Sequence, residues 1–297
     1  MDHDEDGRAR STVAVTGTTG ALGSRIARRL AGHGVPQLLL GRDVAGIPEL
    51  VGAQRRGPAP YDDEAALRPA LDGASTLVLV SGRPLGRRLE EHAAVITAAR
   101  AVGVERVVYV SLLGAGPDAT YRNARDHWLT ERFLADSGVR HTVVRAGIYA
   151  STPASLADDD LVVRGPAGAG RAAFVAHEDI AAVIAAVVRD DGAPSVHDGR
   201  TLEVTGPEAM TLAEAVGQIA VATGRPYRHE PETPEQAFTR RLRLGLSGEQ
   251  IEAWISWYLA IAGGGLSTVT DVVPRLTGSP ATPVAAIDWW PPPGRAS

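Results

Sequence analysis

Two reactive residue types are missing from this sequence of 297 residues. It contains no cysteine, which excludes disulfide bonds, thiolate zinc sites and thiol nucleophiles. All 30 residues counted under lysine and arginine are arginine, so the chain also has no lysine. A mechanism that needs a side-chain amine, such as a Schiff base or a Walker-type phosphate site, is therefore excluded.

Long apolar runs and an excess of positive charge are also missing. The longest uninterrupted apolar run, residues 180–188, is about half the length that a membrane span requires. Residues 1–10 are acidic and polar, without the apolar segment of a signal peptide. The formal net charge of -5 indicates no basic surface for nucleic acid or anionic lipid. We expect a soluble, cytoplasmic protein with no membrane or nucleic-acid partner, either a monomer or a weak homodimer.

The first half of the chain alternates apolar runs of strand length with helical patterns. The runs that we expect to be strands are residues 12–16, 37–40, 53–56, 75–80, 106–110 and 141–144. Amphipathic stretches at 22–30, 89–101 and 124–135 lie between them. Mostly apolar strands separated by helices are typical of βαβ crossovers in a parallel sheet. The pattern predicts an α/β fold, a doubly wound, Rossmann-like parallel sheet of six strands.

We expect four segments along the chain. Residues 1–10 are predicted to be a disordered tail and residues 11–150 a dinucleotide-binding core. Residues 151–200 combine a turn-rich, mobile loop with the remaining core elements. Residues 201–297 are predicted to form a smaller, mostly helical substrate cap. Ser/Thr-x-x-Glu/Gln capping boxes predict three helix starts in that cap, at Thr211, Thr233 and Ser247.

A glycine-rich turn directly follows the first predicted strand. Between residues 16 and 23 it reads TGTTGALG, with glycines at Gly17, Gly20 and Gly23, and it leads into a predicted helix. This spacing lets the backbone turn tightly, approach a pyrophosphate and pack the helix closely. The first amides of the helix then face the phosphate. A tight turn without a ligand is the alternative, but the position between strand and helix favours a dinucleotide.

The end of the second predicted strand bears on the choice of dinucleotide. A site selective for NAD places a carboxylate there to bind the ribose 2′-hydroxyl, whereas a 2′-phosphate favours arginine. Gly41 removes the carboxylate and Arg42 supplies a guanidinium that can bind phosphate and stack on adenine. Asp43 is one residue too far along and is expected to open the next turn. We predict NADPH as cofactor, with NADH disfavoured; a solvated loop arginine is the alternative.

Seven segments together carry a family resemblance. They are TGTTGALG at 16–23, YDDEAAL at 61–67, VERVVYVSLLGA at 104–115, HWLTERFLADSG at 127–138, VVRAGIY at 143–149, FVAHEDIA at 174–181 and LEVTGPEAMTLAE at 202–214. With them the chain resembles the atypical short-chain dehydrogenase/reductase superfamily, in its NmrA-like and quinone-reductase-like branch, over nearly its whole length.

The resemblance implies a set of cofactor contacts. They fall on Gly17, Thr19, Gly20, Leu22, Gly23, Arg42, Ser81 and Gly82, and on the turn Ala146, Gly147 and Ile148 along the nicotinamide. Relatives often carry aspartate where Pro60 stands, so we expect Tyr61 or Asp62 to replace it at the adenine.

The catalytic positions depart from the superfamily pattern. Typical members carry a serine after the fifth strand and Tyr-x-x-x-Lys on the next helix, often with glutamate four residues on. Ser111 fits the serine, but Asn123 stands at the tyrosine and His127 at the lysine, with Glu131 four residues further. The usual proton donor is therefore missing, and the sequence identifies no partner that activates the Ser111 hydroxyl.

Several groups could replace the missing acid. His127 could donate a proton or hold the ribose, and we favour cofactor positioning. Tyr121 would point about 200° away from Asn123 on a helix, and Tyr149 is another candidate donor. The substrate itself could help, if a phenol beside the reacting ketone shares its proton with the developing alkoxide. A positioned acid contributes about 10²–10⁴-fold, so one of these compensations is needed.

Three aromatic side chains share one face of a predicted cap helix. Trp254, Trp257 and Tyr258 lie at i, i+3 and i+4, in a chain with only 5% aromatic residues. They suit a flat, apolar substrate, together with Ser111 and Tyr149; core packing is the alternative. We expect no metal, because Asp179 in the tempting 177–179 triplet is predicted to be a helix N-cap. A structural role is expected for His92.

These observations favour an NADPH-dependent ketoreductase of atypical short-chain type. The expected substrate is a hydrophobic polycyclic aromatic ketone of the angucyclinone type, from an antibiotic or other polyketide pathway. Two alternatives remain open. A quinone or azo reductase has electron-poor acceptors that take hydride with little acid help, and a redox-sensing NmrA-like regulator binds NADP without catalysis.

Overall fold

The computed structural model describes residues 11–82, 87–190 and 193–287, so the predicted tail at 1–10 lies outside the described residues. The chain divides into two compact units that alternate along the sequence. Unit 1 comprises Met1–Ser111, His127–Val144 and Ile180–Leu202, and unit 2 comprises Leu112–Asp126, Arg145–Asp179 and Glu203–Ser297. The division of the chain at residues 150 and 200 stays a prediction.

A seven-stranded sheet forms the centre of a Rossmann-like fold, in the order β10-β6-β5-β4-β1-β2-β3. Its strands are β1 (Val13–Val15), β2 (Gln37–Leu40), β3 (Ala53–Arg56), β4 (Thr76–Val80), β5 (Arg106–Leu112), β6 (Arg140–Ala146) and β10 (Thr201–Val204). β1 pairs in parallel with both β2 and β4. From β1 the chain continues to β2 on one side and reaches β4 on the other side, so the strand order changes direction at β1. Ligands of doubly wound sheets bind at such a point. The predicted fold class is confirmed.

The sheet has one strand more than predicted. Six strands match the predicted runs to within two residues at each end. The seventh, β10, lies in the segment that was expected to belong to the cap, where the sequence predicted no strand. Its segment alternates exposed and buried side chains, whereas five of the predicted strands rested on mostly apolar runs and the weaker candidate at 53–56 on its place in the order.

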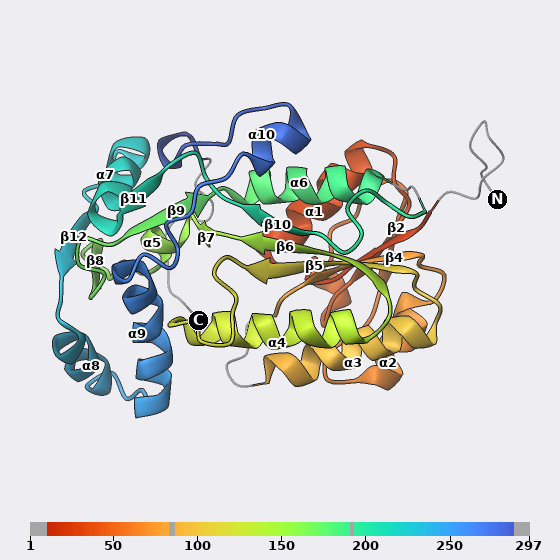
Figure 1. Ribbon diagram of the computed structural model, residues 1–297, viewed down its shortest axis with the longest axis horizontal. Coiled ribbons are helices and arrows are strands. Elements are labelled where there is room, and N and C mark those ends of the chain that lie inside the picture. Colours follow the sequence, from red (N-terminus) through yellow and green to blue (C-terminus); the bar gives the residue numbers. More distant parts are fainter. Residues whose placement is uncertain (1–10, 83–86, 191–192, 288–297) are drawn as a thin grey trace. The chain divides into compact units, whose positions relative to one another are not determined.

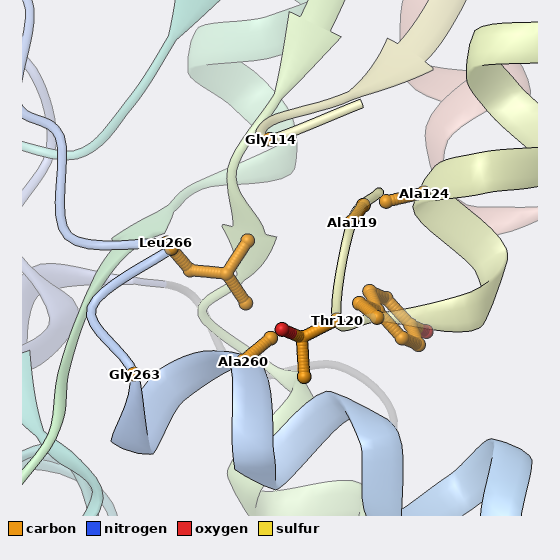
Figure 2. A pocket seen from close by; sticks show the side chains of 9 residues that line it. Gly114, Ala119, Thr120, Ala124, Ala260, Gly263 and Leu266 are labelled. Carbon is orange, nitrogen blue, oxygen red and sulfur yellow. The ribbon is translucent and has the colours of Figure 1, made fainter. Parts of the chain in front are cut away.

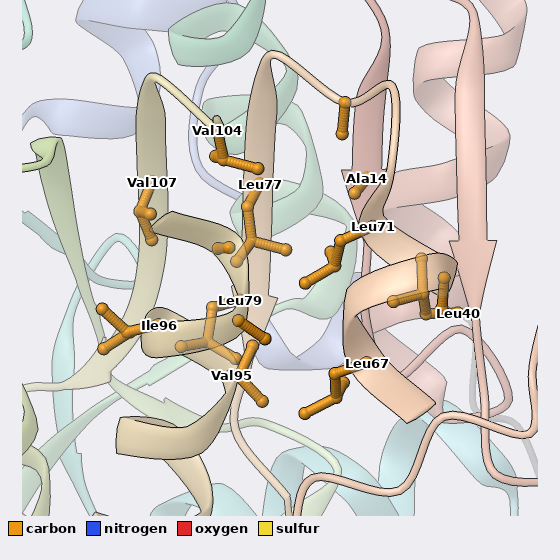
Figure 3. Close-up of a cluster of buried hydrophobic side chains, with 14 of the residues drawn as sticks. Ala14, Leu40, Leu67, Leu71, Leu77, Leu79, Val95, Ile96, Val104 and Val107 are labelled. Carbon is orange, nitrogen blue, oxygen red and sulfur yellow. The ribbon is translucent and has the colours of Figure 1, made fainter. Parts of the chain in front are cut away.

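Helices cover both faces of the sheet. α2 (Glu64–Leu71), α3 (Arg88–Ala101) and α4 (Arg122–Asp136) lie on one face, and α1 (Ala21–Gly32) and α6 (His177–Arg189) on the other (Figure 1). Leu67 and Leu71 of α2 and Ile96 of α3 pack on Leu77 and Leu79 of β4, and all five are fully buried (Figure 3). Removing such side chains from water stabilises the fold by about 1.5–3 kcal/mol each.

Unit 2 contains two small sheets and several helices. β7 (Ile148–Tyr149), β9 (Arg171–Val175) and β11 (Ala209–Thr211) form one sheet, and β8 (Val162–Gly165) pairs in parallel with β12 (Arg228–Pro231). Its helices are α5 (Thr152–Ser155), α7 (Leu212–Thr223), α8 (Pro234–Leu242), α9 (Gly248–Ala262), α10 (Val272–Thr277) and the 3₁₀ turn η2 (Val284–Ala286). The segment 151–171, predicted as a turn-rich excursion, contains α5 and β8; its mobility stays a prediction.

The three predicted capping boxes are confirmed. Thr211, Thr233 and Ser247 are the N-caps of α7, α8 and α9. In each, the hydroxyl accepts from the backbone N–H three residues on, and that residue's side chain accepts from the N-cap N–H. Both contacts satisfy amides that a helix leaves open at its start.

Candidate functional site

The glycine turn between β1 and α1 needs its glycines for steric reasons. Gly17 has φ +64°, in the left-handed region. A Cβ added to Gly23 would lie 2.2 Å from the Gly17 carbonyl oxygen. A side chain at position 23 would therefore push α1 away from the loop, so this glycine allows the close helix approach that dinucleotide sites use.

The first turn of α1 has no internal cap. Gly20 is the N-cap residue, makes no side-chain hydrogen bond to the helix, and is followed by no acidic residue in the first turn. Two buried threonines brace the loop: Thr16 Oγ1 accepts from Val80 N at 2.9 Å, and Thr18 Oγ1 donates to Leu40 O at 2.9 Å. Because these hydroxyls are engaged with neighbouring strands, the helix amides are left for an anion.

Arg42 lies exposed just after β2, where the sequence places the 2′-phosphate contact. No carboxylate of a described residue lies within ion-pair distance of it. Asp43 instead caps the 3₁₀ turn η1 (Val44–Gly46) by accepting from Ala45 N at 3.0 Å, as predicted. The guanidinium is therefore positioned at the end of β2 without an internal anion.

Further predicted cofactor residues of unit 1 differ in their contacts and their exposure. Tyr61 donates from its hydroxyl to Val80 O at 2.7 Å, and burial raises the pKa of this phenol, so it stays neutral. Asp62 is exposed, 3.6 Å from Arg87. Leu22 is buried in α1 and Thr19 is exposed, so only the backbone of Leu22 is available to a ligand. Their cofactor roles stay predictions.

An arginine that the sequence reasoning missed lies beside Ser81 and Gly82. Arg88, at the start of α3, is 6% exposed; its guanidinium donates to Gly82 O at 2.9 Å and contacts the Ser81 hydroxyl. Its Nε atom is buried, with no hydrogen-bond partner in the described structure. Nothing in the sequence distinguishes Arg88 from its exposed neighbour Arg87, because both precede the helical pattern predicted at 89–101.

Ser111 has a partner that the sequence did not reveal. Its hydroxyl, 3% exposed at the end of β5, donates to Glu131 Oε1 at 2.5 Å. The sequence identified no such partner, and bonding to nearby backbone was the alternative for this hydroxyl. Glu131 stands four residues after His127, so the two share a face of α4, but the sequence does not show that this face meets Ser111.

His127 is a buried, neutral imidazole. It is 7% exposed, and its Nδ1 lies 2.7 Å from the hydroxyl of Tyr109. Burial, with the nearby charge of Arg88, lowers the pKa of His127 well below its usual value. An imidazolium acid at neutral pH is therefore disfavoured, and cofactor positioning remains the role that we propose for it.

His92 has the structural surroundings that the sequence predicted. It is fully buried, with Nδ1 3.1 Å from Thr130 Oγ1 and 3.4 Å from the Tyr109 hydroxyl. Burial, and then Arg88, lower the pKa of His92 to about 3. His92, Tyr109 and His127 thus form a buried network of neutral groups on α3, β5 and α4.

Asn123 and Tyr121 lie together in unit 2. Tyr121 was expected to point away from Asn123, but α4 begins only at Arg122, so Tyr121 is outside the helical register. Asn123 Nδ2 donates to the Tyr121 hydroxyl at 2.9 Å. The residue at the usual tyrosine position thus orients a neighbouring tyrosine.

A small cavity within unit 2 is bounded by the loop before α4 and the end of α9. Its volume is about 110 Å³, and Tyr121, Thr120 and Leu266 contribute side chains to its wall (Figure 2). The rest of the lining is glycine and alanine, including Gly114 and Ala260. Such a space is apolar and is about the size of a single ring.

The predicted nicotinamide turn is tightly packed within unit 2. Gly147 donates from its backbone to Val204 O at 2.8 Å, and a Cβ there would lie 2.6 Å from Ala173 O. Ala146 and Ile148 are buried, and the Tyr149 ring lies 4.2 Å from that of His177. The roles of these residues toward cofactor or substrate stay predictions.

Trp254, Trp257 and Tyr258 pack against other apolar side chains of unit 2, as the core-packing alternative expects. Trp257 is 6% exposed and Tyr258 is fully buried, with its hydroxyl donating to Arg164 O at 3.1 Å. Trp254 is half-buried, with its ring 4.3 Å from that of Tyr258, beneath the guanidinium of Arg241. A direct contact of the three with substrate stays a prediction.

Asp179 is not an N-cap, contrary to the prediction. α6 begins at His177, so Asp179 lies inside its first turn. Its carboxylate instead accepts from the backbone N–H and hydroxyl of Thr282 at 2.7 and 2.8 Å. Across the described part of the chain, no three His, Asp or Glu side chains converge as a metal site requires. In the same residues, no helix has the length and apolarity of a membrane span.

Comparisons with known proteins bear on the glycine turn. Residues 17–191 match a family model described as NAD(P)H-binding. The chain is 32% identical to quinone oxidoreductase 2 of Escherichia coli over 92% of this chain and 96% of that protein. It is 30% identical to an NAD(P)H azoreductase of Xenophilus azovorans, over 91% and 94%.

Solved structures extend the likeness to the fold. The crystal structure of an NADPH-dependent quinone oxidoreductase from Escherichia coli, in complex with NADPH, matches with TM-score 0.81 and 31% identity over 92% of this chain and 97% of that one. The negative transcriptional regulator NmrA matches at 14% identity with TM-score 0.71, over 91% and 92%, and shows the fold alone. The chain therefore belongs to the family of NAD(P)H-binding oxidoreductases.

Proposed function

We propose that this NAD(P)H-dependent oxidoreductase uses NADPH to reduce electron-poor conjugated acceptors, of which quinones and azo compounds are the leading classes. The observation that carries the acceptor class is the state of the two catalytic candidates of unit 1. His127 is buried and neutral, and the one hydrogen of the Ser111 hydroxyl is donated to Glu131. Neither side chain is a ready acid for a simple ketone.

The cofactor assignment rests on the loop and on Arg42. The Gly17–Gly23 contact and the uncapped start of α1 form a cradle that a Cβ would fill, which fits a pyrophosphate. Arg42 would hold the 2′-phosphate, and the NADPH complex of the quinone oxidoreductase supports this choice. When bound, NADPH supplies the hydride; the protein orients it, an effect that can contribute about 7–11 kcal/mol.

Quinones and azo compounds suit a site of this kind because conjugation spreads the charge that hydride transfer creates. A general acid is worth about 10²–10⁴-fold when charge develops on a single oxygen. With a quinone the new negative charge is delocalised over the ring, so less depends on immediate protonation. The quinone oxidoreductase and azoreductase that this chain resembles support both acceptor classes.

A polycyclic aromatic ketone with a neighbouring phenol is the second candidate, favoured by the same engaged Ser111. Hydride would add to the carbonyl carbon, the C=O electron pair would move to oxygen, and the phenol proton would transfer to that oxygen. The resulting phenoxide regains its proton from water. Angucyclinone ketones have this chemistry, and the sequence resembles the ketoreductase of simocyclinone biosynthesis in lacking the Tyr/Lys pair.

The test is NADPH oxidation by the purified protein with a panel of acceptors. The panel contains naphthoquinones, an azo dye, aromatic ketones with a neighbouring phenol, and the same ketones without it. We expect turnover of quinones and azo compounds, slower turnover of phenolic ketones, and none of the simple ketones. Tight NADPH binding with no turnover of any acceptor would contradict the proposal and favour a redox-sensing regulator.

A further inference from the structure

Polar side chains from one strand and one helix meet in the core of unit 1. On β5, Tyr109 and Ser111 are two residues apart and so face the same side of the sheet. On α4, His127 and Glu131 are four residues apart and share a helix face. The distances pair Tyr109 with His127 and Ser111 with Glu131.

The Ser111–Glu131 contact determines what Ser111 can offer to a ligand. A hydroxyl has one hydrogen to donate and two lone pairs that accept, whereas an ionised carboxylate only accepts. At 2.5 Å the bond has the length of a charge-assisted O–H···O⁻ contact, which is about twice as strong as a neutral one. Donating to a neutral carbonyl would exchange the stronger bond for a weaker one.

We infer that Glu131 holds Ser111 as a hydrogen-bond acceptor, so that the site prefers acceptor molecules bearing a hydroxyl whose hydrogen is not already bonded within the molecule. Hydroxyquinones with the hydroxyl away from both carbonyls are the substrate class with this chemistry. Glu131 is then a positioning residue that sets specificity without contacting the substrate. The inference rests on the proposed function, in which Ser111 faces the acceptor.

The burial of Ser111 supports this assignment. Ser111 is 3% exposed, so water does not compete freely for its hydrogen. In these surroundings a ligand that offers a second acceptor leaves its own polar atom unsatisfied, whereas a ligand hydroxyl finds the Ser111 lone pairs. A methyl ether in place of the hydroxyl loses that bond and keeps the ring system.

The test compares 6-hydroxy-1,4-naphthoquinone, whose hydroxyl is too far from either carbonyl for an internal hydrogen bond, with its O-methyl ether. Dissociation constants are measured with NADP⁺ bound, where no hydride is available, and kcat/KM is measured separately with NADPH. For the wild type we expect the hydroxyl compound to bind about five- to tenfold more tightly, the value of one hydrogen bond. Equal binding of the two compounds would overturn the inference.

Variants separate this role from a structural one. Glu131→Gln can donate its amide hydrogen to Ser111 and so free the hydroxyl hydrogen; we expect the preference to fall to about unity or to reverse. Ser111→Ala should also abolish it, Ser111→Thr should retain it, and Asp136→Asn, an exposed change on the same helix, should leave it unchanged. An undiminished preference in Ser111→Ala, or in a folded Glu131→Gln, would overturn the inference.

The experiments distinguish failure of the proposed function from failure of the role inferred for Glu131. Loss of NADPH turnover for every acceptor would contradict the proposed reductase function, yet the binding preference would still be measured in the NADP⁺ complex. Turnover of quinones without any preference for the hydroxyl compound would leave the reductase function intact and remove the role of Glu131.

Discussion

Two helices of the molecule, α7 in unit 2 and α1 in unit 1, begin in different ways. In unit 2, α7 starts with Thr211, whose hydroxyl accepts from Glu214 N at 3.1 Å while Glu214 accepts from Thr211 N at 2.7 Å. In unit 1, α1 starts with Gly20, which offers its helix no side-chain cap. A helix that satisfies its own amides gains stability, whereas one that leaves them open can bind an anion.

Buried polar groups in the described part of unit 1 lack some of their hydrogen-bond partners, whereas the capping boxes of unit 2 are fully bonded. Burial and the charge of Arg88 lower the pKa values of His92 and His127, and no carboxylate within the described ranges raises them again. Arg88 is buried beside the end of β4 with its Nε unsatisfied in the described structure. Unit 1 thus leaves polar groups incompletely satisfied around the predicted cofactor contacts, and such sites are commonly functional.

The largest effect is expected from Gly23→Ala. The new Cβ would lie 2.2 Å from Gly17 O, so α1 must move away from the loop. We expect NADPH binding to weaken by at least about 10²-fold, because it would lose hydrogen bonds to the charged pyrophosphate that contribute about 1.5–3 kcal/mol each. The matched control is Gly217→Ala in α7, where a Cβ meets nothing within 4 Å. The control should bind NADPH normally; equal binding by both variants would contradict the cradle.

Arg42→Ala tests the contact that we propose with the 2′-phosphate of NADPH. A hydrogen bond to a charged group contributes about 1.5–3 kcal/mol, so we expect NADPH binding to weaken by about 10–100-fold. NADH binding should change little, because NADH lacks the 2′-phosphate. Arg28→Ala, an exposed change on α1, is the control. An unchanged ratio of the NADPH and NADH dissociation constants in Arg42→Ala would rule out this contact.

The buried histidines make the stability of the fold depend on pH. The pKa of His92 is about 3 in the fold, against about 6.5 in the unfolded chain, so the unfolded chain binds more protons between these values. The free energy of unfolding should therefore fall as pH drops below about 6.5, approaching about 1.4 kcal/mol per pH unit for this residue.

Denaturant unfolding of His92→Gln from about pH 6.5 to about pH 5 measures that contribution. Its stability should depend less on pH than that of the wild type, whatever its absolute stability. The exposed His33→Gln serves as the control and should keep the wild-type slope. A wild-type slope in His92→Gln would show that this imidazole is not held neutral by the fold.

Removing a cap in unit 2 gives the smallest effect. Thr233→Ala deletes the hydroxyl that accepts from Gln236 N at 3.2 Å, and we expect a loss of about 1 kcal/mol in the free energy of unfolding. NADPH affinity should stay the same, because the box serves the helix alone. A weaker affinity for NADPH in this variant would contradict the division between helices that cap themselves and the helix that binds an anion.

Much of the fold could be predicted because its signals are local. The apolar runs gave five strands, and the spacing of Thr211 and Glu214 identified the start of α7. Strand β10 was missed because only alternate side chains are buried, and Asp179 was misplaced because the sequence does not show that Thr282 binds it.

The site was only partly predictable, because some of its contacts join residues of separate elements. The glycine spacing implied the close approach of Gly23 to the loop, which the geometry requires. The pairing of Ser111 with Glu131 depends on the register of α4 against β5, and spacing along either element does not fix that register. Arg88 was missed because burial of an arginine depends on the surrounding fold.

The most direct measurement is calorimetric titration of the wild-type protein with NADPH, NADP⁺ and NADH. We predict saturable binding of NADPH and NADP⁺, at least about tenfold tighter than that of NADH. Only these two carry the 2′-phosphate that reaches Arg42. Absence of binding by all three, or binding of NADH as tight as that of NADPH, would contradict the proposed site.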